Sequence, residues 1–310
     1  MTRTALRFAY GTNGFGDHRI GDALRVLADL GYDGVSLTLD HHHLDPYAPD
    51  VAARTDRVRK VLDRTGLDVV VETGARYLLD PMRKHQPTLV STEGRAHRVD
   101  LLRRATEIAA GLGATTVHLW SGAAPDDVPA VPADEAWKRL AQGCATVLEH
   151  AGRAGVDLAF EPEPGMLVAT LQDYRRLVDL LGGHDRFRLT LDIGHCRCLE
   201  PHPVVECVHR SADRLAHVQI EDMRRAVHEH LPFGDGEIDF PPVLAALADV
   251  GYRGLVSVEL PRHSHAATLQ ARRSIAFLRE AAAAARTVRP PELVSTPTPE
   301  PRLMKGAVRP

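Results

Sequence analysis

Residues 27–37 read LADLGYDGVSL, and residues 247–256 read LADVGYRGLV. In each stretch an amphipathic pattern stops at a glycine, a tyrosine follows, and a short apolar run typical of a β-strand begins. The same helix-to-strand turn therefore occurs near both ends of the chain. A repeated unit of this kind favours an α/β fold that is built from similar strand–helix pairs.

Strand-like runs alternate with longer helical patterns along the whole chain. The expected strands are Leu6–Tyr10, Gly34–Leu39, Leu67–Glu72, Thr115–Trp120, Val156–Glu161, Phe187–Asp192, Leu215–Ile220 and Leu255–Glu259. The expected helices are Ile20–Leu30, Val51–Thr65, Ala96–Gly111, Ala133–Ala154, Leu171–Leu181, Pro203–Ser211, Phe240–Val250 and Arg272–Ala285. Strand and helix repeated about eight times over roughly 250 residues predict a (β/α)8 TIM barrel, with a doubly wound open sheet as the alternative. We therefore expect a single TIM-barrel domain over residues 1–286.

Residues 287–310 differ in composition from the rest of the chain. Prolines recur there, at Pro290, Pro291, Pro297, Pro299, Pro301 and Pro310. They would interrupt any helix, and few apolar residues lie between them. We expect a Pro-rich tail that is disordered or packs on another subunit.

The composition excludes several classes of protein. The 38 basic and 41 acidic residues give a net charge of −3, which argues against a nucleic-acid partner. No apolar run approaches the ~20 residues that a membrane-spanning helix needs, and the N-terminus shows no signal-peptide pattern. The four cysteines show no disulfide framework. We therefore expect a cytoplasmic protein without membrane association.

The fifth, sixth and eighth predicted strands end on an acidic residue that we select as a candidate metal ligand. Glu161, Asp192 and Glu259 each follow an apolar run directly. In a TIM barrel the C-terminal ends of the strands meet at one face, and a buried carboxylate there is costly unless it is paired or bound to a metal. We therefore expect the three carboxylates to hold one divalent cation. The alternative is that each of them caps the helix that follows.

The predicted strand 215–220 supplies a fourth ligand. His217 and Gln219 point to the same side because side chains alternate along a strand, and Gln219 lies nearer the C-terminal end. A glutamine carbonyl suits a hard ion such as Mg²⁺ or Mn²⁺, whereas imidazole favours Zn²⁺, Co²⁺ or Fe²⁺. Glu161, Asp192, Gln219 and Glu259 form an oxygen-only set, which favours Mn²⁺ or Mg²⁺ over Co²⁺ or Zn²⁺.

Five motifs together resemble the sugar isomerase/epimerase superfamily, whose members are xylose-isomerase-like TIM barrels. They are Glu161 at a strand end, Asp192-x-x-His195, His217-x-Gln219, the loop 234–240 (GDGEIDF), and Gly251-Tyr252-x-Gly254 before Glu259. The resemblance covers about residues 5–285. The superfamily includes ketose 3-epimerases, inosose isomerases and dehydratases, hydroxypyruvate isomerase and the endonuclease IV branch. Ketose epimerases usually have His where Gln219 stands, whereas hydroxypyruvate-isomerase-like members have the His-x-Gln strand.

The resemblance implies a divalent-metal-dependent isomerase or epimerase of a small ketose, keto-cyclitol or hydroxy-keto acid. Glu161 and Glu259 would both bind the metal and transfer a proton next to the substrate carbonyl, through a metal-stabilised enediolate. Members of the superfamily often form dimers or tetramers, so we expect a homodimer or homotetramer.

Substrate-binding residues are also implied by the resemblance. His195 and one of Arg224 and Arg225 would hold substrate oxygens, and the arginine would pair with a phosphate or carboxylate if the substrate carries one. Glu72 and His118, on the third and fourth predicted strands, are further candidates. The long segment 78–95 is expected to act as a lid over this site.

Three alternatives remain at this point. A lyase (dehydratase) would share the first proton removal but would expel a β-hydroxyl from the enediolate. An endonuclease IV-like multi-zinc hydrolase would use His228 and His230, which with His217 are candidates for additional metal ligands. A non-catalytic binding barrel is the third alternative, although it would have no need of three converging acids.

Overall fold

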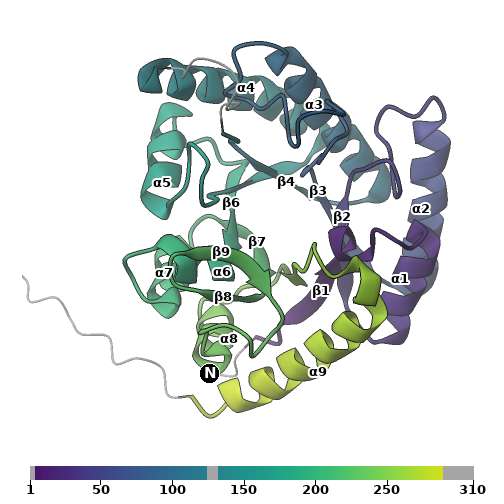
Figure 1. Cartoon of the computed structure of the whole chain (residues 1–310), viewed down its shortest axis with the longest axis vertical. Coiled ribbons are helices and arrows are strands. Elements are labelled where there is room, and N and C mark those ends of the chain that lie inside the picture. The colour runs from purple at the N-terminus through teal and green to yellow at the C-terminus, as the bar shows by residue number, and fades with distance from the viewer. Residues whose placement is uncertain (1–3, 124–131, 289–310) are drawn as a thin grey trace, which may run out of the picture.

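Eight parallel strands form a closed ring, because the first and the last of them pair with each other (Figure 1). The computed structural model describes residues 4–123 and 132–288. The barrel strands are β1 (Arg7–Gly11), β2 (Gly34–Thr38), β3 (Asp68–Glu72), β4 (Thr116–Trp120), β5 (Asp157–Glu161), β6 (Phe187–Asp192), β7 (Leu215–Ile220) and β10 (Leu255–Val258). Around the ring their order is β1, β10, β7, β6, β5, β4, β3, β2. The predicted TIM barrel is confirmed, and the closed ring excludes an open sheet.

The helices surround this ring (Figure 1). They are α1 (Ile20–Asp29), α2 (Val51–Thr65), α3 (Arg95–Leu112), α4 (Ala133–Ala154), α5 (Leu171–Leu180), α6 (Ile193–Leu199), α7 (Val204–Ser211), α8 (Phe240–Asp249) and α9 (Ala267–Ala285). Two 3₁₀ turns, η1 (Thr12–Phe15) and η2 (Ser264–Ala266), follow β1 and β10. The predicted elements agree closely with these bounds, except that the last helix begins at Ala267 rather than at Arg272.

Two features of the chain were not expected from the sequence. Helix α6 begins directly after β6, and a hairpin of β8 (Asp222–Arg224) and β9 (Val227–Leu231) follows β7. Tight hairpin turns are usually marked by glycine or asparagine at a positive φ. Here Ala226 takes that conformation, with φ of 60°, so the usual turn signal is missing from the sequence.

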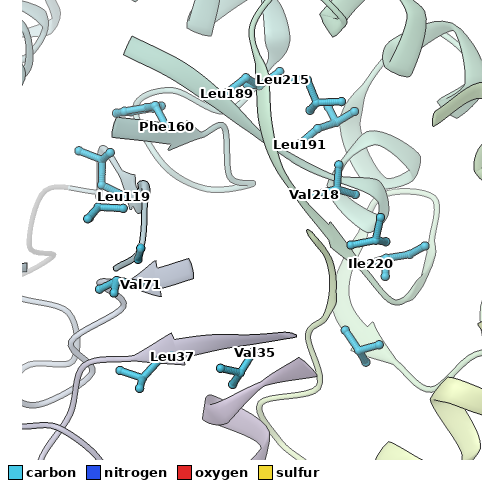
Figure 2. Close-up of a cluster of buried hydrophobic side chains, with 14 of the residues drawn as sticks. Val35, Leu37, Val71, Leu119, Phe160, Leu189, Leu191, Leu215, Val218 and Ile220 are labelled. Carbon is cyan, nitrogen blue, oxygen red and sulfur yellow. The ribbon is translucent and has the colours of Figure 1, made fainter. Parts of the chain in front are cut away.

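Alternation along the strands divides their side chains into an outer and an inner set. The outer set packs against the helices and is apolar. Figure 2 labels members of it, namely Val35, Leu37, Val71, Leu119, Phe160, Leu189, Leu191, Leu215, Val218 and Ile220. All of these side chains are buried. Because this outer layer carries the hydrophobic stabilisation, the inner set is free to be polar.

The inner set is mixed inside the barrel and acidic at the C-terminal strand ends. Ala9, Val70 and Leu255 form a small cluster separate from the main core. Farther along, the Ser36 hydroxyl donates a 2.6 Å hydrogen bond to Ser257 Oγ. These two short hydroxyl side chains therefore satisfy one another.

Two further expectations concern the C-terminal tail and membrane-spanning helices. The predicted tail, residues 287–310, lies outside the described residues from position 289 onward, so it stays a prediction. Within the described ranges, no helix is both long enough and apolar enough to cross a membrane.

A buried arginine holds the segment between β3 and α3, residues 73–94. Arg98 in α3 is 2% exposed. Its guanidinium donates to the backbone oxygens of Thr73 (3.2 Å), His85 (2.6 Å) and Pro87 (2.9 Å), and it packs over the Trp120 ring at 4.7 Å. Burial lowers the pKa of Arg98 to about 10, so the side chain is charged at neutral pH. The segment predicted to be a lid is therefore anchored to α3.

We predict that Arg98→Ala lowers the free energy of unfolding by about 2–4 kcal/mol, because three carbonyl oxygens lose a charged donor and a void replaces the guanidinium. Urea unfolding measures the change. Arg103→Ala, at an exposed position of the same helix, is the control and should change stability by less than about 0.5 kcal/mol. Equal effects of the two substitutions would contradict the anchoring role.

Candidate active site

A pocket of about 360 Å³ lies at the C-terminal ends of the barrel strands. Its wall is formed by the ends of β2, β3, β4, β5 and β7, by the loops after β1, β3, β5 and β10, and by residues of α6 and β9. This is the face on which TIM barrels carry their active sites, since the loops there vary without disturbing the barrel.

The four predicted metal ligands lie at the C-terminal ends of neighbouring strands, and three of them, Glu161, Gln219 and Glu259, line the pocket. Glu161 and Asp192 end β5 and β6, Gln219 lies near the end of β7, and Glu259 directly follows β10. A carboxylate oxygen of Asp192 lies within 4.8 Å of one in Glu161 and of one in Glu259. Gln219 is the register partner of Asp192 on the neighbouring strand. Ring closure thus brings four residues from distant parts of the sequence to one place.

Asp192 combines the two roles that the sequence left as alternatives. Its Oδ1 accepts a 2.7 Å hydrogen bond from the backbone nitrogen of His195 and so caps α6. Its Oδ2 is buried and accepts no hydrogen bond from any described residue. A buried oxygen in that state is costly unless a positive group binds it. Capping therefore does not exclude metal binding, because the two oxygens serve different purposes.

Gln219 presents a second free oxygen. Its Nε2 donates to Glu72 Oε1 at 3.1 Å, while its Oε1 is buried and has no hydrogen-bond partner among the described residues. The carboxylates of Glu161, Asp192 and Glu259 and this carbonyl offer oxygen donors, and a histidine lies in each group of ligand atoms to which the three acids belong. Such oxygen donors fit a hard divalent cation, so the residues present are suited to the metal that the sequence predicts.

Two imidazoles surround Glu161. His118 Nε2 on β4 donates to Glu161 Oε2 at 2.5 Å, and His195 Nδ1 lies 3.1 Å from Oε1. Burial acts to raise the pKa of Glu161, but the two imidazoles outweigh it and hold that pKa well below its ordinary range. Burial likewise acts to lower the pKa of His195, which Asp192 and Glu161 raise well above the usual value. Glu161 is therefore ionised beside positively charged partners.

Glu259 has a different environment, in which acids predominate. Asn13 Nδ2 in η1 donates to Glu259 Oε1 at 2.9 Å. Burial raises the pKa of Glu259 well above its ordinary range; Glu72, Glu161 and Asp192 raise it further, and His230 acts in the opposite direction. This repulsion among carboxylates is what a divalent cation between them would relieve.

Three histidines form a second cluster beside the acids. Ring nitrogens of His195, His228 and His230 all lie within 4.8 Å of one another, and the Nε2 atoms of His195 and His228 are 3.0 Å apart. Burial and the two neighbouring imidazoles lower the pKa of His228 to about 4, so this ring is neutral at pH 7 and has a lone pair to offer. The ring of His228 can therefore offer a nitrogen to a cation.

His217, the other candidate for an additional ligand, lies elsewhere. It is fully buried inside the barrel. Its Nε2 is 3.7 Å from Glu72 Oε1 and 3.4 Å from Ser36 Oγ. His217 belongs to none of the ligand groups that the described residues form, and its contacts are those of a polar residue in the barrel interior.

The predicted substrate residues divide into two groups. Glu72, His118 and His195 line the pocket. Arg224 and Arg225 are not among the lining residues, and their role in substrate binding stays a prediction. Both are exposed; Arg224 donates to the backbone oxygen of Asp235 at 2.5 Å, and Arg225 to that of Glu200 at 2.6 Å. Both arginines lie in the β8–β9 hairpin, whose other strand contributes His228 and His230 to the pocket.

Glu221 is a buried acid that was not among the predicted site residues, although it directly follows the predicted strand 215–220. It is fully buried, both its carboxylate oxygens lack hydrogen-bond partners among the described residues, and His230 Nδ1 lies 3.6 Å from Oε1. A Cβ at Gly194 would lie 2.1 Å from that oxygen, so glycine is needed beside it. Glu221 lies two residues after Gln219, so strand alternation places the two side chains on the same side, and Glu221 joins the group of Asp192 and Glu259.

Asn13 and Glu163 also line the pocket without having been selected as site residues. Burial, and then the charge of Glu161, raise the pKa of Glu163 to about 7. The signal for Glu163 was present in the Glu161-Pro162-Glu163 sequence, which places a second acid directly after the strand end. Asn13 had no such signal, because it reaches Glu259 only through closure of the barrel.

Comparison with known proteins identifies relatives over different parts of the chain. The model of the xylose isomerase-like TIM barrel family matches residues 24–281. Inosose dehydratase from Lacticaseibacillus casei is 30% identical over 151 residues, which are 43% of this chain and 50% of that protein. L-ribulose-5-phosphate 3-epimerase UlaE from Escherichia coli (strain SMS-3-5 / SECEC) is 25% identical over 243 residues, which are 77% of this chain and 81% of that protein. The chain spans about half the length of the curated relatives that it matches at 30% identity or more.

The fold comparison agrees with the family match. The crystal structure of 3-keto-D-glucoside 4-epimerase YcjR from E. coli superimposes with a TM-score of 0.72 at 20% sequence identity, covering 89% of this chain and 100% of that one. At this identity the likeness concerns the fold alone. The family model, however, covers most of the chain, including every barrel strand except β1. The chain therefore belongs to the xylose isomerase-like TIM barrel family.

Proposed function

We propose that this chain is a divalent-metal-dependent isomerase or epimerase of a small ketose, keto-cyclitol or hydroxy-keto acid. One observation carries the proposal: Glu161 and Glu259 enter the same pocket from different strands, and Asp192 lies within 4.8 Å of both. Two carboxylates so placed are suited to removing and returning a proton next to a carbonyl. The names of two relatives, a ketose phosphate epimerase and an inosose dehydratase, support sugar-like substrates for this chain.

The proposed metal ligands are Glu161, Asp192, Gln219 and Glu259. Mn²⁺ or Mg²⁺ is favoured over Co²⁺ or Zn²⁺ because all four donors are oxygens. When bound, such an ion acts as a Lewis acid and stabilises negative charge that develops on substrate oxygens.

The proposed roles of the protein side chains follow from their positions. One of Glu161 and Glu259 removes the proton from the carbon beside the carbonyl. The other returns a proton, either on the opposite face (epimerisation) or at the neighbouring carbon (isomerisation). His195 and His118, which already contact Glu161, hold substrate oxygens by hydrogen bonds, and Glu72 binds a hydroxyl farther along the pocket wall.

We further propose that the enzyme works in the cytoplasm as a homodimer or homotetramer. The four cysteines are free and buried in the fold, a state that suits a reducing compartment. The oligomeric state rests on the resemblance to the sugar isomerase/epimerase superfamily.

Metal binding is the first test. Chelator-treated protein should take up about one equivalent of Mn²⁺ per chain, measured by plasma mass spectrometry after dialysis. Since the ion binds only the folded state, a concentration of 100 times its Kd should raise the free energy of unfolding by about 2.7 kcal/mol. Gln219→Ala should weaken Mn²⁺ binding at least tenfold, about 1.4 kcal/mol, because it removes one donor oxygen. Gln142→Ala, at an exposed glutamine of α4, is the matched control.

Other metal contents would change the assignment. Two or three zinc ions per chain would favour an endonuclease IV-like hydrolase, a second candidate that the cluster of His195, His228 and His230 supports. Failure to bind Mn²⁺, Mg²⁺, Co²⁺ or Zn²⁺ under any condition would contradict both enzyme assignments.

Proton transfer is the second test. Mn²⁺-loaded protein should incorporate solvent deuterium next to the carbonyl of a ketose, an inosose or a short hydroxy-keto acid, followed by NMR. Glu259→Gln should slow this exchange by about 10²–10⁴-fold, because an amide cannot take up the proton. Glu149→Gln makes the same chemical change at an exposed position of α4 and should leave the rate unaltered.

The products distinguish the remaining readings. Exchange that persists in Glu259→Gln would show that the proton-transfer role is wrong. Exchange accompanied by loss of a hydroxyl would identify a lyase. Metal-loaded protein that exchanges none of these substrates would favour a binding barrel.

A further inference from the structure

Three cationic side chains line the pocket without an acidic partner. Arg76 and Lys84 belong to the segment between β3 and α3, and Arg262 follows β10. Within the described part of the chain, none of the three forms an ion pair with a carboxylate; Arg76 donates only to backbone oxygens. Lys84 and Arg262 are exposed, whereas Glu161 and Asp192 are buried, so the three residues lie at the mouth. We call them the mouth cations.

We propose that the mouth cations bind an anionic oxygen group of the substrate, a phosphate or a carboxylate. The substrate of the proposed reaction is then an acidic sugar derivative rather than a neutral sugar. This inference rests on the proposed function, since it takes the reacting carbonyl to lie at the acids and the anionic group to lie at the mouth.

Arg76 joins the two segments that carry the mouth cations. Its Nη2 donates to the backbone oxygens of Asn13 (3.1 Å) and Pro261 (3.4 Å). Pro261 directly precedes Arg262, so these bonds hold the guanidinium of Arg76 beside the Arg262 segment. A guanidinium has five N–H donors. Those that the two backbone oxygens do not use remain available to an oxyanion, which arginine binds through paired hydrogen bonds.

The three charges are close enough to repel one another. Partial burial lowers the pKa of Lys84, the charges of Arg76 and Arg262 lower it further, and Glu163 acts in the opposite direction. Like charges gathered in a partly desolvated space are unfavourable. An oxyanion between them would remove this repulsion, so the arrangement is suited to a bound anion and poorly suited to neutral hydroxyls alone.

The pocket separates opposite charges along its depth. Among the lining residues, Glu72, His118, Glu161 and His195 are buried, Arg76 is half-buried, and Lys84 and Arg262 are exposed. A volume of about 360 Å³ lies near the lower limit of small-molecule sites. It therefore suits one small substrate that reaches from the acids to the mouth, with its anionic group on the carbon farthest from the carbonyl.

The two arginines that the sequence analysis proposed for anion binding do not line the pocket. Arg224 and Arg225 are bonded to backbone oxygens of Asp235 and Glu200 outside the pocket. Arg76, Lys84 and Arg262 are the arginine and lysine side chains that line it in the described structure.

Matched substrates test the inference on the Mn²⁺-loaded full chain. A ketose, its terminal phosphate ester and the corresponding keto-sugar acid are compared by kcat/KM for solvent-deuterium exchange. One anionic substrate should exceed the neutral ketose by at least 100-fold, and added salt should reduce that preference because charges near the surface are screened. Whichever anionic substrate is preferred identifies the group as phosphate or carboxylate.

Two variants locate the preference. Replacing both Lys84 and Arg262 by glutamine should reduce the preference for the anionic substrate at least tenfold. Arg253→Gln removes an exposed cation that precedes β10, at the opposite end of the barrel, and should leave the preference unchanged. Equal kcat/KM values for neutral and anionic substrates, or a preference that survives the double substitution, would overturn the inference while leaving the proposed reaction intact.

Failure of the proposed reaction has a separate signature. If no substrate undergoes exchange, the anion site can still be tested by binding. Isothermal titration calorimetry then measures the affinity for the ketose phosphate and for the keto-sugar acid. Binding that the Lys84 and Arg262 substitutions weaken at least tenfold would support an anion site at the mouth. Absent binding, or binding that the substitutions do not change, would overturn it.

Discussion

The carboxylates at the C-terminal end of the barrel repel one another, and the side chains around them are placed so that they reduce this repulsion. Closure of the ring brings carboxylate oxygens of Glu221 and Glu259, and one of Glu161, within 4.8 Å of an oxygen of Asp192. Each buried charge there costs free energy unless a partner compensates it. Imidazoles beside Glu161, an amide beside Glu259 and the first turn of α6 beneath Asp192 supply part of that compensation.

Several buried oxygens in this region have no hydrogen-bond donor. Asp192 Oδ2, Gln219 Oε1 and both oxygens of Glu221 are buried without a hydrogen-bond donor in the described part of the molecule. A bound cation would coordinate the unpaired oxygens and would also neutralise the excess negative charge. A neutral hydrogen-bond donor would satisfy an oxygen without neutralising the charge. The same arrangement would supply catalysis, because the acids that bind the ion also reach the substrate.

The proposed catalytic acids stand on strand ends, whereas the residues proposed to select the substrate stand on loops. The acids stand on strand ends whose outer faces are packed against helices (Figure 2), so their separations are set by the barrel itself. The mouth cations stand on loops, and one of these loops is held in place by Arg98 beneath it. In such an architecture, changes in the loop sequences can alter substrate selectivity while the residues at the strand ends keep the same reaction chemistry.

Local pattern alone determined the barrel and the place of its acids. Alternating apolar residues and glycine stops identify the strands, and an acid that directly follows such a run, as in Glu161 and Asp192, must stand at the C-terminal face. The tertiary structure decided the rest. The chain turns at Ala226 into a hairpin without a glycine, and Asn13 meets Glu259 through ring closure. Arg224 and Arg225 do not line the pocket, while Arg76, Lys84 and Arg262 line it. The physical reason is that strand periodicity fixes side-chain direction locally, whereas loop side chains are directed by contacts between segments far apart in the sequence.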